Sequence, residues 1–241
     1  MAAPKIILYT NHLCPWAHRA HIALKELGLQ YEEVIIDLDK PREPWYLEVN
    51  PRGLVPTISY NGTIIPESAI VAQLLADAHP SHLVPPSNTP SGAIQRAHIS
   101  FFVDTFFSKV WSQAFAAQKA ATEEERAAAT EALVTAIEKN NLEGLLYPDG
   151  SETGSGPFFR GAEKLTQVEV LTGSFLLRLL SLYKPQYGLL SSNLPDLLEE
   201  RVPRFYKWAQ EVVKQESVNF IWNEENVGTR TAAKWKAAAK H

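Results

Sequence analysis

The stretch "VPTISYNGTII", residues 55–65, decides the fold of the first third of the chain. Two runs rich in β-branched residues flank Asn61 and Gly62, and Asn-Gly is the dipeptide most typical of a two-residue turn between antiparallel strands. The sequence therefore predicts a β-hairpin with one strand in residues 55–60 and the other in residues 63–65.

A helix is predicted directly after this hairpin. Ser68 precedes an apolar pattern of helical period that covers residues 69–78. The side chains expected to share one face of this helix are Ile70, Val71, Leu74 and Ala78. The hairpin is thus followed by a helix that can cover one side of its sheet.

A strand, a helix and a second strand are predicted before the hairpin. The apolar run 6–9 predicts a strand, and a helical pattern follows it as far as Gly28. Residues 31–37 predict the second strand, and the helix between the two strands implies a right-handed parallel crossover. A short helix is expected around residues 45–47. Residues 1–84 are therefore predicted to form an α/β domain, in the order βαβ, short helix, ββα.

Helix-forming residues dominate the rest of the chain. The proline-rich segment 85–92 predicts a linker, and residues 93–241 are predicted to form an all-helical domain. Thr166 and Glu169 match a capping box, which predicts the start of a helix, and Pro203 predicts a kink or restart. The other expected elements are helices over 93–119, 123–144 and 195–215 and a loop over 147–156.

The composition narrows the class of protein. With 241 residues and 45% hydrophobic content the chain can bury a sizeable core, and a net charge of -4 does not suggest a nucleic-acid partner. We expect no signal peptide and no membrane span. A single cysteine excludes an internal disulfide and a four-thiolate zinc site, and no metal site is predicted. These features favour a cytoplasmic protein.

That single cysteine, Cys14, lies at the predicted junction between the first strand and the first helix. Because Pro15 suits the first position of a helix, the sulfur is expected among unpaired N–H groups at the positive end of the helix dipole, where a thiol pKa is lowered. The alternative is that Cys14 is a small buried hydrophobic residue. Ala17 stands where a Cys-x-x-Cys pair would have its second thiol. Any disulfide of Cys14 must therefore recruit a thiol from another molecule.

Glutathione is the cellular thiol that the neighbouring residues could bind. A cis bond between Val55 and Pro56 would turn the backbone of Val55 toward an extended peptide. Glu67 could meet an ammonium group, and Ser68, at the start of a helix, could hold a carboxylate. Candidates for the remaining carboxylate are Lys40, Arg42 and Arg52. Each of these features has an ordinary structural alternative, so their joint occurrence in this order carries the prediction.

Three motifs together resemble the soluble glutathione transferases. They are "CPWAHR" at the first helix (14–19), "NPRGLVP" before the hairpin (50–56) and "PESAI" at the next helix (66–70). The cysteine is similar to that of the omega-like and lambda-like classes. The resemblance is strong over residues 6–83 and weaker beyond. It implies a thioredoxin-like N-terminal domain, a C-terminal helical bundle, a homodimer and glutathione as co-substrate.

The resemblance also implies roles for individual residues. Cys14 would face the glutathione sulfur, Val55 would pair with its backbone beside the cis Pro56, and Glu67 with Ser68 would meet the γ-glutamyl end. Lys40 and Arg42 both remain candidates for the glycine end. A second-substrate pocket would draw on aromatic residues that could equally be core: Trp16, Phe106, Phe107, Trp111 and Phe115.

The leading hypothesis is a glutathione-dependent thiol transferase or reductase that acts on a small electrophilic or disulfide substrate, with Cys14 as nucleophile. Three alternatives stay open. The chain could conjugate electrophiles to glutathione, it could reduce glutathionyl-hydroquinones, or it could be a non-catalytic interaction module with the same fold.

Overall fold

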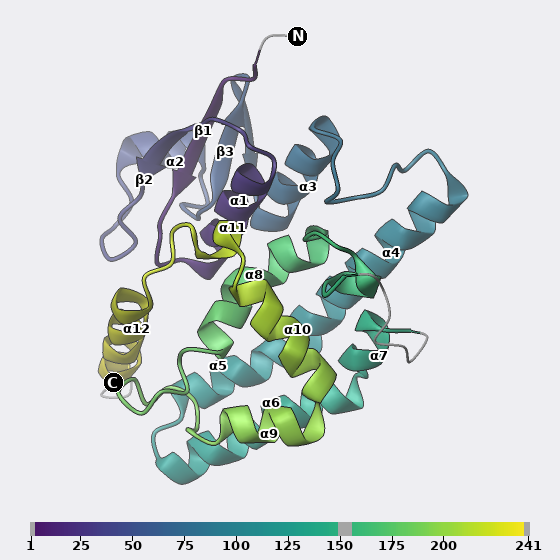
Figure 1. Ribbon diagram of the computed structural model, residues 1–241. Coiled ribbons are helices and arrows are strands. Elements are labelled where there is room, and N and C mark those ends of the chain that lie inside the picture. Colours follow the sequence, from purple (N-terminus) through teal and green to yellow (C-terminus); the bar gives the residue numbers. More distant parts are fainter. Residues whose placement is uncertain (1–2, 149–155, 239–241) are drawn as a thin grey trace.

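The computed structural model describes residues 3–148 and 156–238, and its first part is a four-stranded sheet with three helices (Figure 1). The strands lie in the order β2-β1-β3-β4. Strand β1 pairs parallel with β2 and antiparallel with β3, and β3 pairs antiparallel with β4. The elements are β1 (Ile6–Thr10), α1 (Pro15–Glu26), β2 (Glu32–Ile35), α2 (Pro44–Val49), β3 (Thr57–Tyr60), β4 (Thr63–Pro66) and α3 (Ser68–Ala78).

The predicted order of these elements is confirmed, including the parallel crossover and the hairpin. Asn61 and Gly62 both have positive φ, 51° and 87°, as a two-residue turn between twisted strands requires. Gly28, with φ 63°, ends the first helix region. The order of strands and helices was therefore readable from local patterns alone.

The predicted face of α3 was right only in part: Val71 is buried and Leu74 is half-buried, but Ile70 and Ala78 are exposed. Its most deeply buried side chains are Val71, Ala72, Leu75 and Ala76. Ile70, which was expected on the shared face, is 56% exposed. The reason is tertiary, because α3 packs against both α1 and α8 and these two neighbours select which stripe of an apolar helix is covered.

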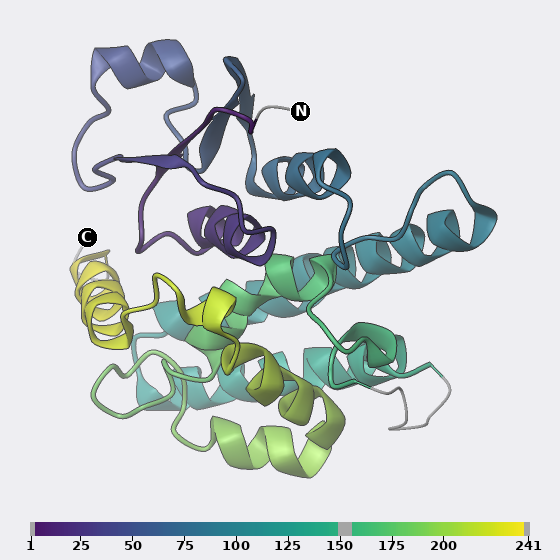
Figure 2. The same cartoon turned by 45° about the horizontal axis from the view of Figure 1, so that its top comes forward.

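The second part of the chain is helical within the described residues, and α1 and α3 lie between it and the sheet, with α2 on the other side (Figure 2). Its elements are α4 (Pro90–Thr105), a π-helical turn η1 (Phe106–Trp111), α5 (Ser112–Lys119), α6 (Glu123–Lys139), α7 (Leu142–Leu146), a 3₁₀ turn η2 (Phe159–Gly161), α8 (Gln167–Leu179), α9 (Leu194–Arg201), α10 (Pro203–Val213), α11 (Glu216–Asn219) and α12 (Glu224–Ala238). The first of these helices begins at Pro90, within the segment predicted as a linker. The loop predicted over 147–156 lies largely outside the described residues.

Helix α8 is the centre of the helical part, and every one of its residues is buried. It begins with the predicted capping box, in which Thr166 and Glu169 each bond the backbone of the other. The break predicted at Pro203 is also confirmed, since α9 ends at Arg201 and α10 begins at Pro203. Across the described ranges, no helix combines the length and the apolar character needed to cross a bilayer.

Candidate active site

Cys14 is the N-cap residue of α1, and Pro15 occupies the first turn as predicted. The backbone N–H groups of Trp16 and Ala17 point at its sulfur. On the other side, the Cys14 sulfur lies 3.9 Å from the carbonyl oxygen of Val55, across the sheet edge. The only thiol of the chain therefore lies between the N-terminus of α1 and the backbone of Val55, just before β3.

The pKa of the Cys14 thiol is raised above its ordinary value, contrary to the expectation from the helix dipole. Burial is the largest cause, because it disfavours the thiolate. The N–H groups of Ala17 and Trp16 and the charge of Arg178 act in the opposite direction but do not offset it. In the protein without ligand, the thiol form thus predominates at neutral pH.

This shift can be measured by alkylation of Cys14 with iodoacetamide. Because only the thiolate reacts, the rate should rise with pH and reach its midpoint above about 8.5, the value of an unperturbed cysteine. Mass spectrometry follows the modification without ambiguity, since the chain has one cysteine. A rate that is already at its plateau by pH 7 would contradict the raised pKa.

Two buried arginines hold the segment that carries Cys14. Arg178 of α8 donates to the carbonyl oxygen of Leu13 at 2.8 Å, and Ser174 donates to that of Pro15 at 2.8 Å. Arg19 of α1 donates to Leu171 at 2.8 Å and to the Ser68 hydroxyl at 2.9 Å. Burial lowers the pKa of Arg19 to about 9 and that of Arg178 to about 10, whereas the proximity of Cys14 raises both. Both guanidinium groups thus favour negative charge on the sulfur.

The residues expected around a γ-glutamyl group lie at the start of α3. The Val55–Pro56 bond is cis, as predicted. Glu67, at φ 75°, is the N-cap of α3, and its carboxylate forms an ion pair with Arg52. Ser68 is buried and is the first residue of the helix, not its N-cap, and its hydroxyl accepts from Arg19. Arg52 is thus engaged with Glu67 and does not stand free for a ligand carboxylate.

Lys40 and Arg42 differ sharply in their surroundings. Arg42 donates to the carbonyl oxygens of Gly53 at 2.9 Å, Asp37 at 2.7 Å and Lys40 at 2.5 Å, so it holds the loop together. The side chain of Lys40 is 79% exposed and has a 3.4 Å ion pair with Asp37. Lys40 can therefore turn its ammonium group toward a ligand at a small cost in free energy, since only a surface ion pair is lost.

The predicted pocket aromatics gather around Phe175 of α8. Its ring centroid lies 4.7 Å from Trp16, 4.7 Å from Phe107 and 4.9 Å from Trp111. Trp16 is 36% exposed and Phe107 is half-buried, whereas Trp111 is buried. Phe106 is also buried in the core, and Phe115 lies at the edge of the cluster, 5.8 Å from Trp111.

The guanidinium of Arg19 stacks beneath these rings. Its carbon lies 4.2 Å from the Phe107 centroid, 4.5 Å from that of Trp16 and 5.1 Å from that of Phe175. Sequence reasoning missed Phe175, Arg178 and this role of Arg19. Their helical pattern was visible, but no local signal told which helices of the two parts would meet.

A cavity of about 740 Å³ lies away from Cys14, which is not among its lining residues. It is formed by the segment after α3 together with α4, α7 and η2, and its walls include Leu83, Ile99, Tyr147 and Phe159. The chemistry proposed at Cys14 therefore does not take place in this cavity.

The geometry defines a thioredoxin-like domain with a cysteine at its first helix, joined to a helical bundle. Residues 13–78 match the family model described as "Glutathione S-transferase, N-terminal domain". Rat glutathione S-transferase omega-1 is 33% identical over 99 residues, which are 41% of each chain, and glutathione S-transferase DHAR2 of Arabidopsis thaliana is 30% identical over 158 residues, 65% of this chain and 62% of that one. The matches thus span about two fifths to three fifths of these relatives.

Solved structures agree over nearly the whole chain. Glutathione transferase Omega 2C from Trametes versicolor superposes with a TM-score of 0.75 and 29% identity, over 96% of this chain and 99% of that one. Rice GST1 in complex with glutathione gives a TM-score of 0.79 and 25% identity, over 98% and 99%. The chain is thus similar to glutathione transferases, in sequence over its first domain and in structure over nearly its whole length, and the similar proteins include omega-class members.

Proposed function

We propose that this protein is a glutathione-dependent thiol transferase in which Cys14 forms a mixed disulfide with glutathione. One observation carries the proposal: the lone sulfur lies at the N-terminus of α1, 3.9 Å from the Val55 carbonyl oxygen. A non-catalytic module does not need a thiol at this position. The similarity to omega-class glutathione transferases supports glutathione as the co-substrate.

The proposed reaction has two exchange steps. The Cys14 thiolate attacks the glutathione sulfur of a glutathionylated substrate, so a new disulfide joins Cys14 to glutathione and the substrate leaves as a thiolate. A second glutathione thiolate then attacks the glutathione sulfur of this disulfide, which releases oxidised glutathione and restores the Cys14 thiolate. No internal thiol competes, because the chain has no second cysteine.

Glutathione itself would bind along the start of β3 and α3. Its cysteinyl backbone would pair with Val55 beside Pro56, and its γ-glutamyl carboxylate would meet the exposed N–H groups near Ser68. Glu67 would accept from the γ-glutamyl ammonium. We assign the glycine carboxylate to Lys40, since Arg42 is engaged by three carbonyl oxygens. A reaction that consumes reduced glutathione also fits a protein of the cytoplasm.

Mass spectrometry of the intact protein tests the covalent step. After incubation with oxidised glutathione, the wild-type chain should gain one glutathione, and reduced glutathione should remove it. The Cys14→Ala variant should gain none. A wild-type protein that binds glutathione but stays unmodified at millimolar oxidised glutathione would rule out the mixed disulfide.

The assignment of Lys40 is tested by comparing two variants. Lys40→Ala should raise the concentration of oxidised glutathione needed for half-maximal modification by about five- to tenfold, which corresponds to the loss of one charge-assisted contact, with Tm unchanged. Arg42→Ala should instead lower Tm, because it removes three hydrogen bonds to loop carbonyls. The assignment is wrong if Lys40→Ala is modified as readily as the wild-type chain.

One observation favours a second candidate function. The raised pKa of Cys14 suits a site in which the reacting thiolate belongs to glutathione, and partly exposed Trp16 could contact an electrophilic second substrate. The protein would then conjugate electrophiles, with Cys14 donating a hydrogen bond to the glutathione sulfur. Turnover of a glutathionyl-hydroquinone would identify the third, chemically related alternative.

A further inference from the structure

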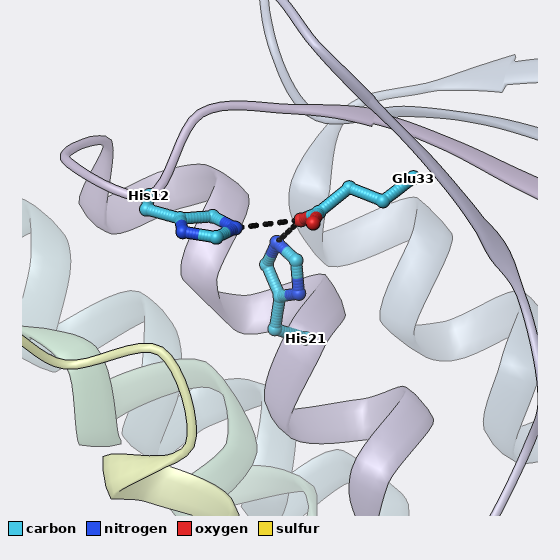
Figure 3. Close-up of side chains that lie close together, drawn as sticks. All are labelled: His12, His21 and Glu33. Carbon is cyan, nitrogen blue, oxygen red and sulfur yellow. Dashed lines mark hydrogen bonds and ion pairs between the residues drawn. The ribbon is translucent and has the colours of Figure 1, made fainter.

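Three side chains from separate elements meet on the β2 side of the first domain, outside the site described above (Figure 3). His12 comes from the segment after β1, His21 from α1 and Glu33 from β2. Glu33 Oε1 lies 2.7 Å from His12 Nε2 and 3.4 Å from His21 Nε2. All three ligand atoms lie within 4.8 Å of one another.

His21 is oriented in the way that metal-binding histidines usually are. Its Nδ1 lies 2.9 Å from the Tyr31 hydroxyl; in the tautomer that carries the proton on Nδ1, this proton is donated to Tyr31 and the lone pair of Nε2 is directed toward Glu33. The Thr10 hydroxyl, 2.9 Å from Nε2, is a second neighbour of that atom.

The open side of the cluster faces solvent. The His21 side chain is fully buried, whereas the side chain of His12 is 44% exposed and that of Glu33 is 32% exposed. An ion can therefore approach His12 and Glu33 from solvent and keep water molecules as its remaining ligands. Two imidazoles and one carboxylate form a nitrogen and oxygen donor set of the borderline type that suits Zn²⁺, Ni²⁺ and Cu²⁺.

We propose that His12, His21 and Glu33 bind a divalent transition-metal ion of the zinc type. The ion takes the place of the contact between His12 and Glu33 and draws the three ligands around itself at about 2.0–2.2 Å. It links the segment that precedes Cys14 to β2. This site is independent of the proposed thiol transfer, because none of its ligands contacts the Cys14 sulfur. No motif revealed it, since residues 12, 21 and 33 are spaced unlike any familiar metal-binding pattern.

Titration of metal-free, untagged protein with Co²⁺ and Zn²⁺ tests the proposal. The Cys14→Ala background removes thiolate ligation, so visible absorption of Co²⁺ and calorimetry of Zn²⁺ report the histidine site alone. We expect one equivalent to bind, with affinity lowered at least about tenfold in His12→Ala and in Glu33→Gln, and also in Tyr31→Phe through the loss of its contact to His21.

The matched control is His82→Ala. His82 forms a histidine–carboxylate pair with Glu26 at 2.9 Å, similar to that of His12 but without a third ligand. This variant should bind the ions like its parent. The proposal is overturned if no ion binds at submillimolar concentration, or if His12→Ala and Glu33→Gln bind as tightly as His82→Ala; the three side chains are then a hydrogen-bonded network only.

Discussion

Replacing Cys14 with alanine should lower the rate of glutathione-dependent disulfide reduction at least about a hundredfold, because the variant lacks the nucleophile of the covalent step. The measurement is a coupled assay of oxidised glutathione release, with a mixed disulfide of glutathione and a small thiol as substrate. The fold should be little affected, since alanine keeps the Cβ atom and the sulfur's contact with the Val55 carbonyl oxygen, at 3.9 Å, is weak.

A parallel assay of the conjugation of a chloro-aromatic compound to glutathione makes this result decisive. The thiol-transfer proposal gives Cys14 no part in conjugation, which uses the thiolate of glutathione itself, so Cys14→Ala should then retain conjugation. A Cys14 that donates a hydrogen bond to the glutathione sulfur predicts instead that conjugation falls. Cys14→Ser is the matched control, because a hydroxyl keeps the hydrogen bond but cannot form a disulfide. If Cys14→Ala reduces the disulfide at the wild-type rate, the proposed thiol transfer is refuted and conjugation becomes the better description.

Replacing Glu169 with alanine should destabilise the protein by about 4 kcal/mol, the largest effect on stability that we expect. Its buried carboxylate accepts four hydrogen bonds, from the backbone of Phe159 and Thr166, the hydroxyl of Thr166 and the indole of Trp208, all at 2.7–2.8 Å. Alanine leaves these buried donors unpaired. Equilibrium unfolding in urea measures the decrease in the free energy of unfolding. In thermal unfolding, the same decrease should lower Tm by roughly 10 °C.

The chain contains its own control for this prediction. Helix α6 begins with a second capping box, formed by Thr122 and Glu125, with the same reciprocal hydrogen bonds. This box is exposed, so water can replace the carboxylate, and Glu125→Ala should cost only about 1 kcal/mol. Equal losses in the two variants would show that burial of Glu169 contributes nothing beyond capping.

Much of the fold could be predicted because its signals are local. The turn at Asn61 and Gly62 and the capping box at Thr166 each depend on neighbouring residues in the sequence. The buried face of α3 could not be predicted in the same way. Both Ile70 and Val71 are apolar, and only contact with α1 and α8 decides which one is covered.

The candidate site shows the same division. The junction of strand and helix at Cys14 was readable from Pro15, but the pKa of the thiol was not, because burial by distant residues outweighs the helix dipole. The π-helical turn at 106–111 was also invisible, since its i to i+5 bonds leave no mark in composition. The engagement of Arg42 with loop carbonyls likewise depends on tertiary structure.

The hydrogen bonds from α8 to the cysteine segment limit how such a chain can be recombined. Ser174 and Arg178 lie one turn apart and hold the carbonyl oxygens of Pro15 and Leu13, on either side of Cys14. A chimera that joins this first domain to a foreign helical half inherits the cysteine without its brace. The hydrogen bonds would be restored by a helical half that has a serine and an arginine four residues apart on the equivalent helix. We therefore expect the two halves to be exchangeable between proteins that share this pair.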